Sequence, residues 1–244
     1  MSLDASVMTL LDRPVWASLS NQHLALSVGG PLARRYASGV NLFASARDDS
    51  SAALAALADL VRPGERIFIL QVPDILVPAG LVSVKSARGV QMTATRSLQG
   101  ACAEDELVEL TDADAPEMLA LAKLTEPGPF LERTHTMGAF RGIRVGGRLA
   151  AMAGERFRFP GHTEVSGVCT HPDFRGRGFA RRLSAAVAAR IESRGEQPFL
   201  HSWKGNRPAI ALYESLGFEI RAEVDVQVLE RCPLPDGFQI RDSA

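Results

Sequence analysis

A stretch between residues 165 and 182, VSGVCTHPDFRGRGFARR, has the residue types and the spacing of an anion-binding site. It starts with β-branched and small residues typical of a strand, breaks at Pro172, and becomes helical from Phe179 onward. Gly176 and Gly178 allow the backbone to come close to a ligand. The first helical turn leaves N–H groups without intrahelical partners, and the helix dipole adds partial positive charge. The stretch therefore predicts a site for phosphate groups.

Three nucleotide-binding patterns compete for this turn, and the spacing separates them. A P-loop is excluded because no Lys-Ser/Thr pair follows Gly178. The fingerprint of dinucleotide-binding folds is disfavoured because Arg181 stands where a third Gly or Ala is needed, and the acidic ribose partner is missing. The remaining pattern, Arg175-x-x-Gly178-x-Ala180 after Thr170, is similar to the pyrophosphate loop of the GNAT superfamily of acyl-CoA-dependent N-acyltransferases.

A second motif follows in the order that this family would require. Asn206 is placed to cap a helix and Gly217 to follow its last turn, so local structure alone explains both residues. The whole run, Asn206-x-x-Ala209-x-x-x-Tyr213-x-x-x-Gly217, nevertheless resembles the second GNAT motif at each landmark. The order of strands and helices that the resemblance implies extends over residues 106–231. Within the superfamily, the sequence looks closest to the FR47-like group.

The resemblance implies that acetyl-CoA is bound as the acyl donor and that no metal is needed. An extended pantetheine arm hydrogen-bonds like an added strand, which implies a free strand edge at Val168, Cys169 and Thr170. A bulge often opens this edge in the family, and the N–H near Val168 is then the implied oxyanion donor. The other implied coenzyme contacts are Arg175, Gly176, Arg177, Gly178, Phe179, Ala180 and Asn206.

The general acid of the implied reaction is Tyr213, whose phenol would protonate the departing thiolate. Without the motif, Tyr213 would be interpreted as a packed side chain whose hydroxyl reaches solvent. Cys169 is interpreted as buried packing and not as a nucleophile, because no His-Asp constellation supports it.

The general base is less sharply defined by the sequence. Glu164, at the start of the central strand, resembles the base carboxylate of the histone-acetylating members, and it shares strand parity with Ser166 and Val168. Glu155 and His201 are alternatives, the latter because its intrinsic pKa lies nearest neutrality. Ordered water is a further alternative. A strand-end Glu is usually a solvated charge, and a strand His usually has its hydrogen bonds satisfied.

Hydrophobic periodicity predicts mixed α and β structure along the chain. Residues 1–60 are predicted to be mostly helical, with an alanine-rich second helix at 52–61, and strands are predicted at 65–71, 81–85 and 90–95 in one sheet. The elements predicted for the second half are, in order, strand 107–110, helix 112–124, a hairpin of 137–145 and 148–159, helix 179–193 and strand 198–203.

The periodic pattern lapses near residues 97–105, which predicts a boundary between two halves. Residues 105–244 are predicted to form a GNAT N-acetyltransferase domain, with an α/β fold around a mixed sheet. Residues 1–104 are predicted to form a smaller α/β half that is structural or dimer-forming, or a degenerate GNAT-like domain. A homodimer is accordingly one of the expected states.

Composition narrows the partners and the location. The 244 residues are 46% hydrophobic and 23% charged, with a formal net charge of -1, so broad attraction to nucleic acid or to a membrane is not expected. Three widely spaced cysteines without a CxxC pair suggest neither a disulfide framework nor a zinc site, and a reducing cytosol fits best. The N-terminal segment has too short an apolar run for a signal peptide, so a cytoplasmic location is expected.

The motifs together predict an N-acetyltransferase that moves an acetyl group from acetyl-CoA to a primary amine by direct attack on the thioester. The acceptor is a small amine or a peptide amine, and the sequence does not define it further. The alternative is a non-catalytic module that binds or senses acyl-CoA through the same loop and binds a partner through its N-terminal half. The presence of Tyr213 favours the enzyme, and unchanged activity in a Tyr213→Phe variant would remove the general-acid assignment.

Overall fold

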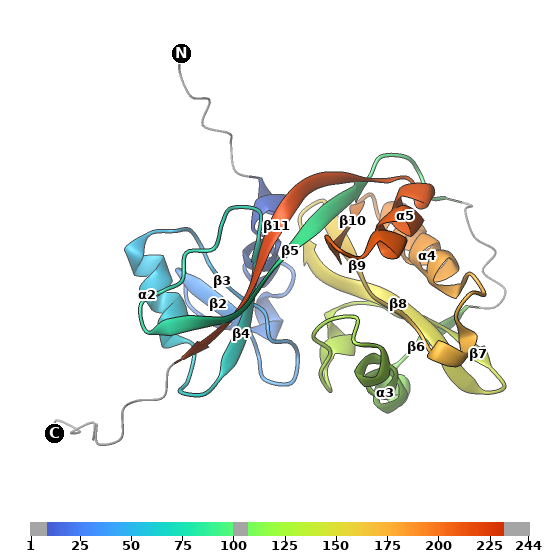
Figure 1. Ribbon diagram of the computed structural model, residues 1–244, viewed down its shortest axis with the longest axis horizontal. Coiled ribbons are helices and arrows are strands. Elements are labelled where there is room, and N and C mark those ends of the chain that lie inside the picture. Colours follow the sequence, from blue (N-terminus) through green and yellow to red (C-terminus); the bar gives the residue numbers. More distant parts are fainter. Residues whose placement is uncertain (1–8, 100–106, 232–244) are drawn as a thin grey trace, which may run out of the picture.

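The computed structural model describes residues 9–99 and 107–231, and its arrangement is shown in Figure 1. The predicted boundary between residues 104 and 105 lies outside the described residues, and the division of the chain into two halves stays a prediction. In the described part of the chain, no helix combines the length and the apolar character needed to cross a membrane.

The N-terminal segment contains less helix than predicted. Its helices are α1 (Pro14–Leu19) and α2 (Ser51–Asp59), and between them lies a small antiparallel sheet of β1 (Ser27–Gly29), β2 (Ala33–Tyr36) and β3 (Ala44–Ala46). The prediction of mostly helical structure for residues 1–60 was therefore wrong. His23, which follows α1, is buried, and its ring Nδ1 lies within hydrogen-bond distance of Ser18 and Tyr36, at 3.0 and 2.9 Å.

The second sheet has eight strands in the order β4-β11-β5-β10-β9-β8-β7-β6. Neighbouring strands are antiparallel except β9 and β10, which run parallel. The strands are β4 (Arg66–Gln71), β5 (Leu81–Ala94), β6 (Val108–Leu110), β7 (Phe140–Val145), β8 (Arg148–Phe159), β9 (His162–Thr170), β10 (Gln197–Trp203) and β11 (Phe218–Arg231). The predicted hairpin is thus confirmed as β7 and β8.

One long strand replaces the two strands predicted at 81–85 and 90–95. The intervening residues, Ser86 to Gly89, continue the strand because they pair with β11 along its whole length. β5 lies between β10 and β11, so a strand from the first half of the sequence completes the sheet formed by the second half. Figure 1 shows β5 and β11 running side by side from one end of the molecule to the other.

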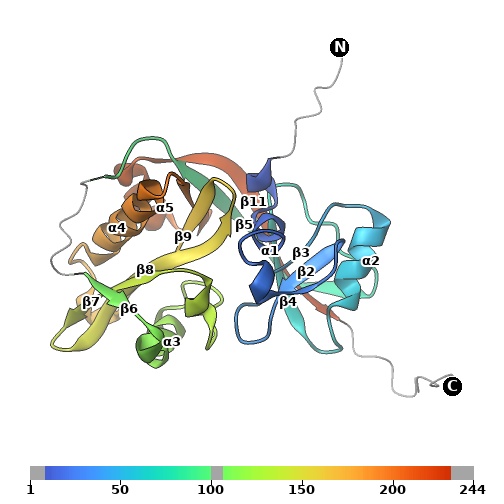
Figure 2. The ribbon, with the colours of Figure 1, turned by 180° about the vertical axis from the view of Figure 1, so that it is seen from behind.

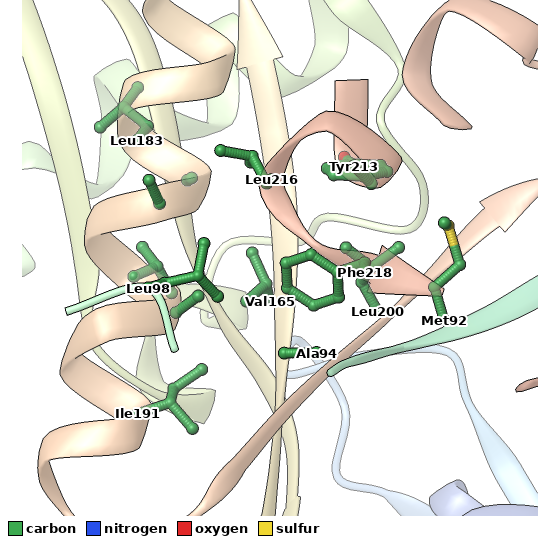
Figure 3. Packing of buried hydrophobic residues seen from close by; sticks show 14 of the residues in the cluster. Met92, Ala94, Leu98, Val165, Leu183, Ile191, Leu200, Tyr213, Leu216 and Phe218 are labelled. Carbon is green, nitrogen blue, oxygen red and sulfur yellow. The ribbon is translucent and has the colours of Figure 1, made fainter. Parts of the chain in front are cut away.

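Three helices cover the part of the sheet around β8, β9 and β10. They are α3 (Ala115–Thr125), α4 (Phe179–Ser193) and α5 (Arg207–Leu216). Figures 1 and 2 show α4 and α5 on one side of these strands and α3 on the other. Leu183, Val187 and Ile191 lie four residues apart and form part of the buried face of α4. Figure 3 shows two of these side chains beside Val165 of β9.

Candidate active site

A cleft of about 730 Å³ opens where β9 and β10 separate. The two parallel strands are paired at three positions, the last being Phe199 with Glu164. Beyond that point both strands line the cleft, β9 through residues 165–170 and β10 through residues 201–203. Because separated parallel strands leave backbone N–H and C=O groups facing the gap, this cleft suits a guest that is itself extended and polar.

A β-bulge shapes the wall formed by β9. Met152 pairs with Cys169 and Gly154 with Ser166, so β9 has one extra residue over this interval. Gly167, within it, has a φ of +62°, a conformation that favours glycine. The bulge also makes one prediction wrong, that Glu164 and Val168 lie on the same face of the strand. Val165 and Val168 are three residues apart but pack in the same cluster, so Val168 does not share a face with Glu164.

The loop from Arg175 to Ala180 forms the end of the cleft beside α4, as the sequence predicted. Gly176 and Gly178 have φ values of +78° and +75°, and no atom lies within 4 Å of a Cβ built on either. Gly178 is the N-cap residue of α4, a helix of 15 residues, so the free N–H groups of the first turn and the helix dipole meet at this loop. The loop is therefore a cradle for anionic oxygens.

Arginines add positive charge around the cradle. Arg175, Arg177 and Arg181 all line the cleft. The guanidinium of Arg177 lies 5.3 Å from the ring centre of Phe174, and that of Arg148 lies 5.6 Å from the same centre. These cation–π contacts orient the Arg177 side chain beside the loop.

Tyr213 reaches the cleft from α5. Its ring is largely buried and makes an edge-to-face contact with Phe218 at 6.2 Å, and Figure 3 shows the two rings close together. In the described part of the chain its hydroxyl has no hydrogen-bond partner, although the residue lines the cleft. Burial, with a smaller effect from the charge of Glu164, raises the pKa of the Tyr213 phenol to about 12. The phenol is thus a proton donor at neutral pH.

Glu164 lies behind the cleft wall and is fully buried. Arg156 donates to both of its carboxylate oxygens, at 2.7 and 2.6 Å, and the ring Nδ1 of His201 lies 2.6 Å from Oε1. A second bulge, in β8 at residues 156 and 157, brings Arg156 to this position. Burial opposes ionisation of the carboxyl, but the charge of Arg156 and the interactions with His201 hold the pKa of Glu164 at about 2.

Comparison with known proteins identifies the family that has this arrangement. The family model of FR47-like proteins matches residues 140–226. The crystal structure of a GNAT-family protein of Novosphingobium aromaticivorans DSM 12444 matches this chain with a TM-score of 0.86. The two sequences are 42% identical, and the match covers 92% of this chain and 99% of the other. The chain belongs to the GNAT family.

More distant structures share the GNAT fold. A GCN5-related N-acetyltransferase from Kribbella flavida is 20% identical, with a TM-score of 0.61 over 91% of this chain and 96% of the other. A GCN5-related N-acetyltransferase-like protein from Streptococcus suis is 15% identical, with a TM-score of 0.56 over 89% of this chain and 92% of the other. No curated protein sequence matches the chain.

The other base candidates of this GNAT chain have their hydrogen bonds satisfied. His201 lines the cleft, but its Nε2 lies 3.1 Å from the side-chain nitrogen of buried Gln91, which can only donate. Because Nε2 must accept this hydrogen bond, the ring proton of His201 is on Nδ1, which donates it to Glu164. Glu155 is buried and paired with Arg194 at 2.8 Å, away from the main cleft.

The remaining sequence-predicted residues also line the cleft. Cys169 and Thr170 line the cleft on β9, and burial raises the pKa of the Cys169 thiol to about 11, which fits packing better than nucleophilic attack. Asn206 also lines the cleft, and its side chain caps α5 by accepting from the N–H of Ala209 at 3.3 Å. Phe179 and Ala180 line the cleft at the start of α4.

Sequence reasoning missed three residues of the site. Arg156 gave no signal, because its pairing with Glu164 depends on the bulge in β8. Glu126 and Trp203 line the cleft, and neither belongs to a motif. Gly167, an isolated glycine inside a strand pattern, could have predicted the bulge in β9, but it gives no signal for these three residues.

Proposed function

We propose that this GNAT protein is an N-acetyltransferase that moves an acetyl group from acetyl-CoA to a primary amine. The observation that carries the proposal is that one cleft contains the cradle of α4, the bulged edge of β9 and the phenol of Tyr213. An anion site, an exposed strand edge and a proton donor are the three features that attack on a pantetheine thioester requires.

The residues of the cleft fit acetyl-CoA. The open space in front of Gly176 and Gly178 leaves room for phosphate oxygens at the helix N-terminus, where Arg175 and Arg177 add charge-assisted hydrogen bonds. The edge of β9 would hold the pantetheine amides, and Asn206 lies across the cleft on the α5 side. When bound, acetyl-CoA supplies the activated acyl carbon and a thiolate leaving group.

The roles of the chain's own atoms follow from this placement. The N–H groups at the bulge, near Val168, are proposed to donate to the carbonyl oxygen as negative charge develops there. The Tyr213 hydroxyl is proposed to donate its proton to the departing sulfur, since it is protonated at neutral pH and has no competing partner in the described part of the chain.

Removal of the amine proton is proposed to end on water in the cleft. Glu164 would contribute indirectly, by fixing Arg156 and His201 in the wall, because its carboxylate is buried, doubly paired and weakly basic. The assignment of Glu164 as the direct base stays a prediction. Because the pKa of Glu164 is about 2, its carboxylate stays ionised between pH 5 and 9. Titration of Glu164 is therefore not expected to change the rate of acetyl transfer over that range.

Release of CoA thiol tests the proposal. Purified protein with acetyl-CoA and a panel of primary amines is expected to release thiol at a rate that rises with amine concentration, and the acetylated amine is identified by mass spectrometry. A protein that binds acetyl-CoA but releases thiol with no amine in a broad panel would instead be the acyl-CoA sensor considered above.

The cradle gives a separate prediction for binding. Gly178→Val should weaken CoA binding at least about tenfold, because a side chain there occupies the space in front of the helix N-terminus. Gly195→Val is the matched control: Gly195 has a φ of +76° and equally open surroundings, but it lies at the other end of α4. Isothermal titration of CoA into both variants measures the effect. Equal loss in the two variants would mean that backbone strain, and not the cradle, was responsible.

A further inference from the structure

Charge is unevenly distributed along the cleft. The lining includes Arg175, Arg177 and Arg181 at the cradle end. Arg156 also lines the cleft, but its charge is balanced by Glu164 behind it. Among the described residues that line the cleft, Glu126 is the one carboxylate. The lining therefore combines a group of arginines at the cradle with a single carboxylate on another segment, at the end of α3.

Glu126 lies beside a residue that contacts the region of the bulge. It is the C-cap residue of α3, which packs on β8 and β9. The next residue, Pro127, lines both the main cleft and a small adjoining cavity, together with Ser166 and Gly167 of the bulge. This is the side of the cleft from which an acceptor would approach the proposed acyl position.

The carboxylate of Glu126 is available to a ligand. Within residues 9–99 and 107–231 it makes no ion pair and no side-chain hydrogen bond, and the residue is exposed. Its backbone is in the left-handed region, at φ 49° and ψ 53°, and no other non-glycine residue in this part of the chain has a positive φ. The backbone N–H still donates to Ala122, so the turn that presents Glu126 is closed.

Trp203 supplies a second feature of the same cleft. It is the last residue of β10, lines the cleft, and is 42% exposed although it is a large apolar side chain. An exposed indole and an unpaired carboxylate facing one cleft are the two groups that recognise an alkylammonium, through cation–π contact and a charge-assisted hydrogen bond.

We infer that Glu126 and Trp203 form the acceptor-binding site and select a primary alkylammonium. The inference rests on the proposed function and names its acceptor class. The amine enters protonated, held by Glu126, and loses one proton to water before its nitrogen lone pair attacks the acyl carbon. The C–N bond forms, the C–S bond breaks, and the sulfur takes the proton of Tyr213. The second proton leaves the nitrogen and returns through water in the cleft to the Tyr213 phenolate, which gives the neutral amide and restores the phenol.

Equilibrium binding to the CoA-saturated protein tests the inference without turnover. Isothermal titration is expected to give n-pentylamine, which is protonated at neutral pH, a Kd at least about tenfold below that of aniline, which is neutral. Glu126→Gln should weaken pentylamine binding about tenfold and leave aniline unchanged. Glu132→Gln is the matched control, because Glu132 lies in the same loop region, is exposed and does not line the cleft.

Equal binding of the two amines, equal effects of the two variants, or no pentylamine binding at millimolar concentration would overturn the inference. The outcome is separable from that of the proposed function. Thiol release that is insensitive to Glu126→Gln would refute the acceptor site and leave the transferase standing. Glu126-dependent amine binding without thiol release from acetyl-CoA would refute the transferase and leave the site standing.

Discussion

Tyr213→Phe is expected to lower kcat for acetyl transfer by a factor of about one hundred or more, with CoA binding unchanged. The variant keeps the ring that packs on Phe218 and removes the hydroxyl that lines the cleft. A thiolate that leaves without a proton donor raises the barrier, and general acid catalysis typically contributes this magnitude. Steady-state thiol release and isothermal titration of CoA together measure the two quantities.

Tyr36→Phe is the matched control for this variant. Tyr36 is the other tyrosine of the chain, and its hydroxyl is buried against Ser18 and His23, remote from the cleft lining. Its loss should lower stability and leave kcat near the wild-type value. Because burial raises the pKa of Tyr213 to about 12, no basic limb from this group is expected below about pH 10. Unchanged kcat in Tyr213→Phe would remove the general-acid assignment.

Glu164→Gln is expected to have the largest effect on folding, lowering the free energy of unfolding at pH 7 by about 3 to 5 kcal/mol. The substitution leaves the mostly buried Arg156 guanidinium, whose side chain is 13% exposed, without the counter-charge of the fully buried Glu164. Urea unfolding measures the difference. Glu109→Gln, which removes an exposed partner of Arg190, should change stability by less than about 1 kcal/mol.

The pH dependence of this difference follows from the lowered pKa. The carboxyl has a pKa of about 2 in the folded protein against 4.5 in the unfolded chain, so the unfolded state binds more protons between these values. The contribution of Glu164 is fully present above pH 4.5 and is lost as the pH falls towards 2. The gap between wild type and variant should narrow over that window by about 3 kcal/mol. A gap that is constant from pH 7 to pH 3 would contradict the buried ion pair as its cause.

Local signals explain what the sequence could predict. The strand, the two glycines and the helix that begins at Phe179 are contiguous, so their arrangement follows from turn and capping preferences, and the structure has them as predicted. Asn206 and Gly217 bound α5 for the same reason, with Gly217 in the left-handed region at φ 100°. Such features depend on a few neighbouring residues.

Pairings between distant residues explain what the sequence could not predict. The insertion of β5 between β10 and β11 joins residues that are more than a hundred positions apart, and no periodicity specifies it. The surroundings of Glu164 depend on a bulge in each of two strands, which reverse the alternation on which the parity argument rested.

A thermal-shift titration with acetyl-CoA, CoA and NADH tests the central proposal, that the cleft binds an acyl-CoA. A ligand that binds the folded state alone stabilises it by about 2.7 kcal/mol at a hundredfold excess over its Kd. We expect acetyl-CoA and CoA to raise the melting temperature in a concentration-dependent way and NADH to leave it unchanged. No shift with either form of CoA at millimolar concentration would contradict the proposal and leave the loop from Arg175 to Ala180 as an ordinary turn between a strand and a helix.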